Sequence, residues 1–207
     1  MGKFEYEYIK NHCDINDYPI CVETGTNLGY STDIIMKLFK KVFTIEIDKI
    51  LYEKAVEKYK DTNVECIFGD SAVEIKKLTE KIDNNCIFYL DAHWSGDNTT
   101  NWDKSNWKGY GIETGYRGEK IDKPTSRQQT PLEDEIDIIN DKCKCKCIIY
   151  IDDMDKFDDN GQGKKDTGFN GEDWSDLNIN IIIKKLKSRL IYKNKFENQL
   201  ILILNNI

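Results

Sequence analysis

Two short segments near the middle of the chain are apolar on both faces, and they constrain the fold more than any other feature. Residues 86–91 read Cys-Ile-Phe-Tyr-Leu-Asp, and residues 147–152 read Cys-Ile-Ile-Tyr-Ile-Asp. A strand without a polar face suits the centre of a parallel sheet, where helices cover both sides. We therefore expect both segments to be central, parallel strands.

Strand-like runs alternate with stretches of helical spacing over most of the chain. Three more parallel strands are expected at 19–23, 42–47 and 64–68, and an antiparallel pair at 190–196 and 200–204. Helices are expected at 31–40, 51–59, 71–79, 131–140 and 177–186. This alternation predicts an α/β fold built on a parallel sheet, with right-handed crossovers and an antiparallel edge, in a single domain over 1–207.

Two long segments do not fit the alternating pattern. Residues 93–129 are polar and rich in Gly, Asn, Trp and Thr, and residues 154–173 are rich in Asp and Gly. Each follows the carboxyl end of a central strand, which is where open α/β sheets bind ligands. Long loops inside a domain are usually functional or disordered. We interpret about 93–130 as an active-site insertion.

Charge and composition limit the partners. The formal net charge of -7 argues against a general nucleic-acid binder, because such proteins neutralise phosphates with clustered Lys and Arg. No apolar run is long enough to span a bilayer, and the first residues lack the apolar core of a signal peptide. Seven cysteines, an odd number, argue against a disulfide framework. We expect a cytoplasmic protein without membrane or nucleic-acid partners, and we leave a homodimer open.

A glycine-containing turn follows the first expected strand. Gly25 and Gly29 are spaced G-x-x-x-G, so neither the G-x-G-x-x-G pattern of dinucleotide sites nor the P-loop pattern is present. Glu23 stands just before the turn. A carboxylate there suits a ligand with an ammonium or sulfonium group, and it would oppose a pyrophosphate at the helix N-terminus.

The next two strands also end in polar residues. Glu46 lies near the end of the second strand, where a carboxylate can accept hydrogen bonds from both hydroxyls of a ribose. Asp70 and Ser71 follow the third strand and could reach an adenine ring. Each residue taken alone has a simpler interpretation, a solvated strand end for Glu46 and a helix N-cap for Asp70. The combination at three successive strand ends favours a nucleoside ligand.

These segments resemble a known family. Residues 23–32, Glu-Thr-Gly-Thr-Asn-Leu-Gly-Tyr-Ser-Thr, look like motif I of class I S-adenosylmethionine-dependent methyltransferases, and residues 44–48 look like their second acidic motif. The resemblance implies a doubly wound, Rossmann-like α/β fold whose seven-stranded, mostly parallel sheet has the order 3-2-1-4-5-7-6 with the last strand antiparallel. It also implies a set of residues that bind S-adenosylmethionine: Glu23, Thr24, Gly25, Thr26, Asn27, Gly29, Ser31, Glu46, Asp70, Ser71 and Asp91.

Carboxylates end both central strands. Asp91 ends the fourth strand, and Asp152 and Asp153 end the fifth. Neighbouring strands would bring these side chains together, and three like charges in one cleft repel one another unless a cation intervenes. Oxygen ligands select hard cations such as Mg²⁺, which could lower the pKa of an acceptor hydroxyl. The alternative is that the three acids only cap strands and helices.

The same segments resemble those of a subgroup, the catechol-type and macrocin-type sugar O-methyltransferases. Residues 90–94 and 150–154 look like the two metal-binding motifs of that subgroup, which implies Asp91, Asp152 and Asp153 as metal ligands and Asp91 as part of the catalytic centre. His93 stands where the sugar enzymes commonly have a second Asp that acts as the base. Histidine is suited to accept a hydroxyl proton near neutral pH, so we predict His93 as the general base. It could instead bind the metal or pack against Trp94.

A further resemblance covers the insertion. Uncharacterised methyltransferase-like proteins share a D-A-H-[WY]-S-G segment and a later [CT]-P-L-x-x-E-[LI] helix, matched here from Asp91 and from Thr130. Aromatic residues recur in between and could stack on a sugar or pack the insertion onto the domain. They are Trp94, Trp102, Trp107, Tyr110 and Tyr116.

We therefore predict a metal-dependent O-methyltransferase that acts on a small polyhydroxylated acceptor such as a sugar or nucleotide-sugar. A catechol-like or other small-molecule methyltransferase would use the same metal geometry. A non-catalytic cofactor-binding module and a NAD-type oxidoreductase are the alternatives from other classes.

Overall fold

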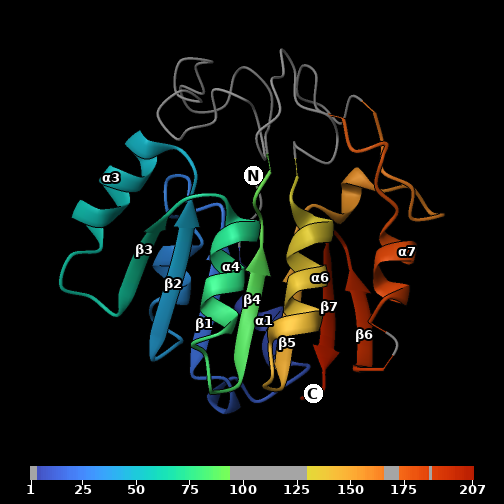
Figure 1. The fold of residues 1–207 in the computed structure, drawn as a ribbon, viewed down its shortest axis with the longest axis horizontal. Helices are drawn as coiled ribbons and strands as arrows, with labels where there is room; N and C mark the ends of the chain where they lie inside the picture. Colours follow the sequence, from blue (N-terminus) through green and yellow to red (C-terminus); the bar gives the residue numbers. More distant parts are fainter. Residues whose placement is uncertain (1–3, 94–129, 166–172, 187) are drawn as a thin grey trace.

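The computed structural model describes residues 4–93, 130–165, 173–186 and 188–207, and its centre is one seven-stranded sheet (Figure 1). The strand order is β3-β2-β1-β4-β5-β7-β6, with β7 antiparallel to both of its neighbours. The order and the antiparallel strand confirm the prediction. The strands are β1 (Ile20–Thr24), β2 (Lys41–Glu46), β3 (Val64–Phe68), β4 (Cys86–Leu90), β5 (Cys147–Ile151), β6 (Leu190–Phe196) and β7 (Gln199–Leu204).

Helices lie on both faces of the sheet, with α4 and α6 on the near face and α1 on the far face in Figure 1. The helices are α1 (Tyr6–Lys10), α2 (Thr32–Ile35), α3 (Lys49–Lys58), α4 (Ser71–Thr79), α6 (Leu132–Lys142) and α7 (Ile179–Lys184), with 3-10 turns η1 (Ile15–Asp17) and η4 (Met154–Lys156).

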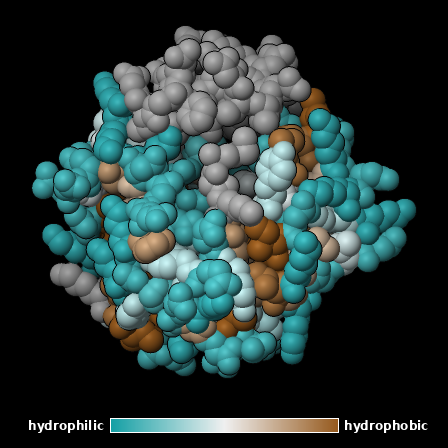
Figure 2. Space-filling model, turned by 180° about the vertical axis from the view of Figure 1, so that it is seen from behind, coloured by the Kyte–Doolittle hydropathy of each residue, from teal (hydrophilic) through white to brown (hydrophobic). Residues whose placement is uncertain are grey.

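The two faces of the sheet form two hydrophobic cores, because successive side chains of a strand point to opposite sides. Every residue of β4 and β5 is buried, as expected for central strands. Phe88 and Ile149 face one core together with Ile136 of α6, and Tyr89 and Tyr150 face the other. Seen from behind, the surface carries mostly hydrophilic side chains, with hydrophobic ones in small areas (Figure 2).

The helix expected at 31–40 is shorter than predicted. After α2 the backbone bonds tighten, since the N–H groups of Lys37 and Leu38 bond to carbonyls three residues back. The Asn63 amide donates to the carbonyls of Met36 and Phe39, at 2.9 and 2.7 Å. These bonds hold the end of this helical segment in place, and the Phe39 ring packs edge-on against Phe4.

Several expectations from the sequence lie outside the described part of the chain. The insertion at about 93–130 is described only at its two ends, and the aromatic residues singled out within it lie outside the described residues. All seven cysteines are described, and all are free thiols. No helix in the described residues combines the length and apolar character that a membrane span requires.

Candidate active site

The turn after β1 has a backbone that only some residues tolerate. Gly25, Asn27 and Gly29 have φ values of 82°, 49° and 77°, in the left-handed region. A Cβ at position 25 would lie 2.8 Å from the Asp91 carbonyl oxygen. Glycine is therefore required at position 25 both for its conformation and because the turn packs directly on the end of β4.

Glu46 ties the end of β2 to this turn. Its Oε2 accepts a hydrogen bond from the Asn27 N–H at 2.7 Å, and its Oε1 accepts one from the Asp48 N–H at 2.8 Å. Burial raises the pKa of Glu46 to about 6, although these backbone bonds oppose the shift. Each carboxylate oxygen can accept a second hydrogen bond. The predicted ribose contact is compatible with this geometry.

Glu23 lies beneath the turn. It is 1% exposed, and its Oε2 accepts hydrogen bonds from the hydroxyls of Thr32 at 2.5 Å and Thr44 at 2.6 Å. Burial raises the pKa of Glu23 to about 7. Thr26 joins the same group through the Thr44 hydroxyl, at 2.6 Å. Glu23 therefore fixes β1, β2 and the start of α2 to one another.

The remaining predicted cofactor residues have structural partners of their own. Asp70 caps α4 by accepting from the Ala72 N–H at 2.9 Å, which is the alternative that the sequence left open. Ser71 is the first residue of that helix. The Thr24 hydroxyl accepts from the Asp91 N–H at 3.3 Å. The Ser31 hydroxyl accepts from the Phe4 N–H at 3.1 Å.

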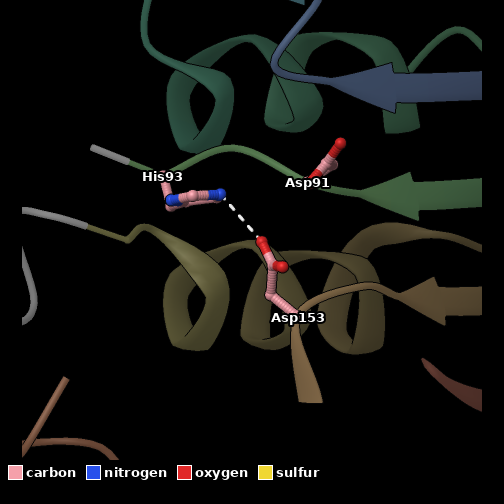
Figure 3. Close-up of side chains that lie close together, drawn as sticks. All are labelled: Asp91, His93 and Asp153. Carbon is pink, nitrogen blue, oxygen red and sulfur yellow. Dashed lines mark ion pairs between the residues drawn. The ribbon is translucent and has the colours of Figure 1, made fainter. Parts of the chain in front are cut away.

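Asp91, His93 and Asp153 come together at the ends of β4 and β5 (Figure 3). Each offers a ligand atom, and these atoms all lie within 4.8 Å of one another. His93 Nε2 is 2.8 Å from Asp153 Oδ2, and both side chains are 14% exposed. Two carboxylates and one imidazole, converging from two strands, fit the first coordination shell of a divalent cation.

The pKa shifts of these acids follow their surroundings. Burial raises the pKa of Asp91 well above its usual value, although the charge of His93 opposes this. Burial also pushes the pKa of Asp153 upward, but the hydrogen bond and charge of His93 outweigh it, so the pKa lies below its usual value. Asp153 has a left-handed backbone, with φ of 58°, of the kind that recurs at functional sites.

The structure places Asp152 differently from the prediction. Its Oδ2 accepts from the Tyr89 hydroxyl at 2.7 Å, and its Oδ1 accepts from the Asp153 N–H at 2.9 Å. Asp152 is 3% exposed. Among the described residues, the converging ligand atoms belong to Asp91, His93 and Asp153, whereas the sequence suggested Asp91, Asp152 and Asp153 as metal ligands.

A hollow adjoins this group, with about 220 Å³ of space that includes open solvent. Trp174 forms part of its wall and lies edge-on to His93, with ring centroids 5.8 Å apart. Phe157 packs edge-on against the same indole at 5.5 Å. The segment after β5 therefore contributes one side of the hollow.

Glu135 of α6 also lines the hollow, and the sequence interpretation missed it. It is 1% exposed, and within the described part of the chain its Oε1 has no hydrogen-bond partner. Burial raises the pKa of Glu135 to about 8, although hydrogen bonds with Ser71 and Thr24 oppose the shift. The sequence does distinguish Glu135, because this acid lies on the helix face that otherwise carries the apolar residues Leu132, Ile136 and Ile139.

Comparisons with known proteins define the fold. No family model matches the chain. A segment of 72 residues is 36% identical to the candidate ribosomal RNA small subunit methyltransferase A of Pyrococcus abyssi, but the match covers 34% of this chain and only 27% of that relative.

Three solved structures resemble nearly the whole chain. A candidate caffeoyl-CoA O-methyltransferase from Staphylococcus aureus has a TM-score of 0.58 at 13% identity, over 97% of this chain and 82% of that one. A candidate methyltransferase from Streptococcus mutans, in complex with SAH, has a TM-score of 0.52 at 13% identity, over 99% of both chains. A protein from Pyrococcus horikoshii has a TM-score of 0.51 at 12% identity, over 97% and 87%. The chain has the α/β methyltransferase fold.

Proposed function

We propose that this chain is an S-adenosylmethionine-dependent methyltransferase. The observation that carries the proposal is the position of Glu46, whose two carboxylate oxygens are fixed at the glycine turn by the N–H groups of Asn27 and Asp48. A buried, oriented carboxylate can accept hydrogen bonds from the hydroxyls of a ribose. Because the neighbouring turn has glycine at position 25, a nucleoside can lie close to the backbone of the protein there. The fold supports the same assignment.

The proposed donor site uses the residues around this turn. Glu46 accepts the ribose hydroxyls, and Gly25 lets the donor lie against the backbone. Asp70 and Ser71 would contact the adenine, and Asp91 would lie near the reactive group. When bound, S-adenosylmethionine supplies an electrophilic methyl group, and S-adenosylhomocysteine remains after transfer.

We place acceptor activation at Asp91, His93 and Asp153. These residues would hold a divalent cation, whose role would be to lower the pKa of an acceptor hydroxyl. Because one of the three ligands is an imidazole, this site would accommodate Mn²⁺ or another transition-metal ion as well as Mg²⁺. Without a cation, neutral His93 would be the base: its Nε2–H would donate to Asp153 Oδ2, 2.8 Å away, and Nδ1 would take the hydroxyl proton.

We propose a small polyhydroxylated acceptor, such as a sugar. The described residues around the hollow include four carboxylates, one imidazole and a Trp, and none of them is Lys or Arg. Such a lining favours hydroxyl donors and disfavours phosphate groups, so a neutral sugar fits better than a nucleotide-sugar.

Methylation of ribosomal RNA is a second candidate, because the one sequence relative described above carries that activity in its name. The net charge of -7 opposes it, since RNA binding relies on clustered basic residues. Transfer of labelled methyl groups to ribosomal RNA, and not to a panel of neutral sugars, would decide for this second candidate.

Calorimetric titration with S-adenosylhomocysteine and then with Mn²⁺ tests the proposal. We expect the wild type to bind both, Glu46→Gln to lose the nucleoside, and Asp153→Ala to lose Mn²⁺ but keep the nucleoside. Glu53→Gln, an exposed acid on α3, is the matched control and should resemble the wild type. A wild type that does not bind S-adenosylhomocysteine would contradict the proposal.

A further inference from the structure

Tyr89 connects the interior of the sheet to the proposed cation site. Its side chain is completely buried in the core on the α1 side of β4. The hydroxyl reaches the carboxyl end of the sheet, where it lies 2.7 Å from Asp152 Oδ2 and 3.3 Å from Asp91 Oδ2. A single buried phenol therefore contacts two of the three acids that end the central strands.

The direction of the hydrogen bonds follows from the number of protons available. The Phe4 N–H donates to Ser31 Oγ at 3.1 Å, and the Ser31 hydroxyl donates to the Tyr89 oxygen at 3.5 Å. Tyr89 has one hydroxyl proton, and the shorter distance directs it to Asp152. The bonds form one directed series from the amino-terminal segment to the end of β5.

Asp152 is thereby held at both carboxylate oxygens. Tyr89 donates to Oδ2, and the backbone N–H of Asp153 donates to Oδ1. The adjacent Asp153 carboxylate is left to pair with His93. Figure 3 shows the Asp153 and His93 side chains pointing toward each other from neighbouring strands, with Asp91 beside them.

We propose that Tyr89 is a positioning residue for the cation site. Its hydroxyl holds Asp152 out of the ligand set, so that Asp91, His93 and Asp153 face the cation. This inference rests on the cation site proposed above. The Tyr89 hydroxyl also lies 3.3 Å from Oδ2 of Asp91, which is one of the proposed ligands. Groups that hold metal ligands in place generally fix the geometry of the site, and removal of such a group lowers metal affinity by about 10- to 100-fold.

The neighbouring strand supplies a matched control. Tyr150 of β5 pairs with Tyr89 in the sheet, is equally buried, and has its ring centroid 5.3 Å away. The Tyr150 hydroxyl bonds with Gln199 and accepts from the Glu5 N–H at 3.3 Å. Tyr150→Phe removes a hydroxyl from the same core without removing a hydrogen bond to a site carboxylate.

The test is calorimetric titration of Mn²⁺ into the wild type, Tyr89→Phe and Tyr150→Phe, with thermal unfolding of each protein. We expect Tyr89→Phe to bind Mn²⁺ about 10- to 100-fold more weakly. Tyr150→Phe should bind Mn²⁺ like the wild type. Both variants should unfold at similar temperatures, because each loses one buried hydroxyl from the same core.

The outcomes separate this inference from the proposed function. If the wild type does not bind Mn²⁺, the cation site is wrong and the inference fails with it. If the wild type binds Mn²⁺ and Tyr89→Phe binds as tightly as Tyr150→Phe, only the inference is overturned. Should Tyr89→Phe not fold, Asp152→Asn replaces it. That change must weaken Mn²⁺ binding less than Asp153→Asn does, and an equal loss would overturn the inference.

Discussion

Glu135 is an acid on the face of α6 that otherwise carries apolar side chains. Leu132, Ile136 and Ile139 share its face and are buried with it. Its pKa is raised to about 8, from an ordinary value of 4.5, chiefly by burial. Between these two values the folded protein holds a proton that the unfolded chain releases, so this residue lowers stability progressively as pH rises.

We predict that Glu135→Gln stabilises the protein more at pH 8 than at pH 5. The neutral amide avoids the cost of burying a carboxyl that the unfolded chain ionises. That cost is larger at pH 8 than at pH 5. Urea unfolding at both pH values measures the difference. Glu133→Gln is the control on the same helix, because Glu133 is only partly buried and pairs with Lys185, and it should show no such pH dependence. An equal gain at both pH values for Glu135→Gln would contradict the assigned ionisation.

Gly25 gives a second prediction at this scale. Gly25→Ala should lower the free energy of unfolding by about 1–3 kcal/mol, because a side chain would adopt an unfavourable φ and meet the Asp91 carbonyl. It should also weaken binding of S-adenosylhomocysteine. The control is Asn27→Gly. This change keeps the backbone N–H that donates to Glu46, and glycine adopts the positive φ of position 27 without strain. A Gly25→Ala variant as stable as the wild type would refute the close packing of turn and strand.

Single residues differ in how far their sequence context reveals them. Asp91, Glu46 and Asp153 could be picked out because acids at the ends of apolar strands are conspicuous. Tyr89 could not, since it reads as one more core residue and its partner lies 63 positions away. The cluster of possible ligand atoms contains His93 instead of Asp152 because of such contacts between distant segments. A local sequence pattern does not reveal these contacts.

At the scale of elements, the termini of helices and strands are held by side chains from elsewhere in the chain. Arg189 is 6% exposed, and its guanidinium donates to the carbonyls of Ile139, Asn140 and Cys145. It also donates to the Asn205 carbonyl at 2.9 Å. One side chain therefore joins the end of α6 to the segments that flank β5 and β7.

We predict that Arg189→Met lowers the free energy of unfolding by at least about 2 kcal/mol, because buried carbonyls would lose charged donors. Lys185→Met is the comparison, since Lys185 pairs with Glu133 and Asp137 at the surface and should contribute less than about 1 kcal/mol. Chemical denaturation of both variants measures the difference. Similar losses for the two would show that Arg189 does not anchor these segments.

The elements differ in how well the sequence predicts them. The structure has β3, α4 and β6 with the predicted bounds, 64–68, 71–79 and 190–196. Their turn residues and helix caps are local signals, such as Asp70 before α4. The helix at 31–40 was overestimated because Phe39 and Asn63 form tertiary contacts that end it early. The short helix α1 has five residues, too few for a periodic pattern to reveal.

At the scale of the whole molecule, the sheet brings the donor and acceptor ends of the proposed site to one edge. Parallel strands β2, β1, β4 and β5 all end there, so Glu46, Gly25, Asp91 and Asp153 lie along the same edge although they are far apart in sequence. The strand order could be predicted because residues 23–32 and 44–48 resemble motifs of class I methyltransferases, and the strand–helix alternation agrees with the sheet of that family. The acceptor could not, since the motifs that indicate kinship with methyltransferases are silent on the substrate.

We propose that this edge of the sheet binds S-adenosylmethionine with its ribose at Glu46. A crystal structure of the protein with S-adenosylhomocysteine tests it most directly. We predict both ribose hydroxyls within hydrogen-bond distance of the Glu46 carboxylate and the sulfur facing the hollow beside Asp91 and His93. A nucleoside bound elsewhere, or a turn at 25–29 that remains empty at saturating ligand, would contradict the account.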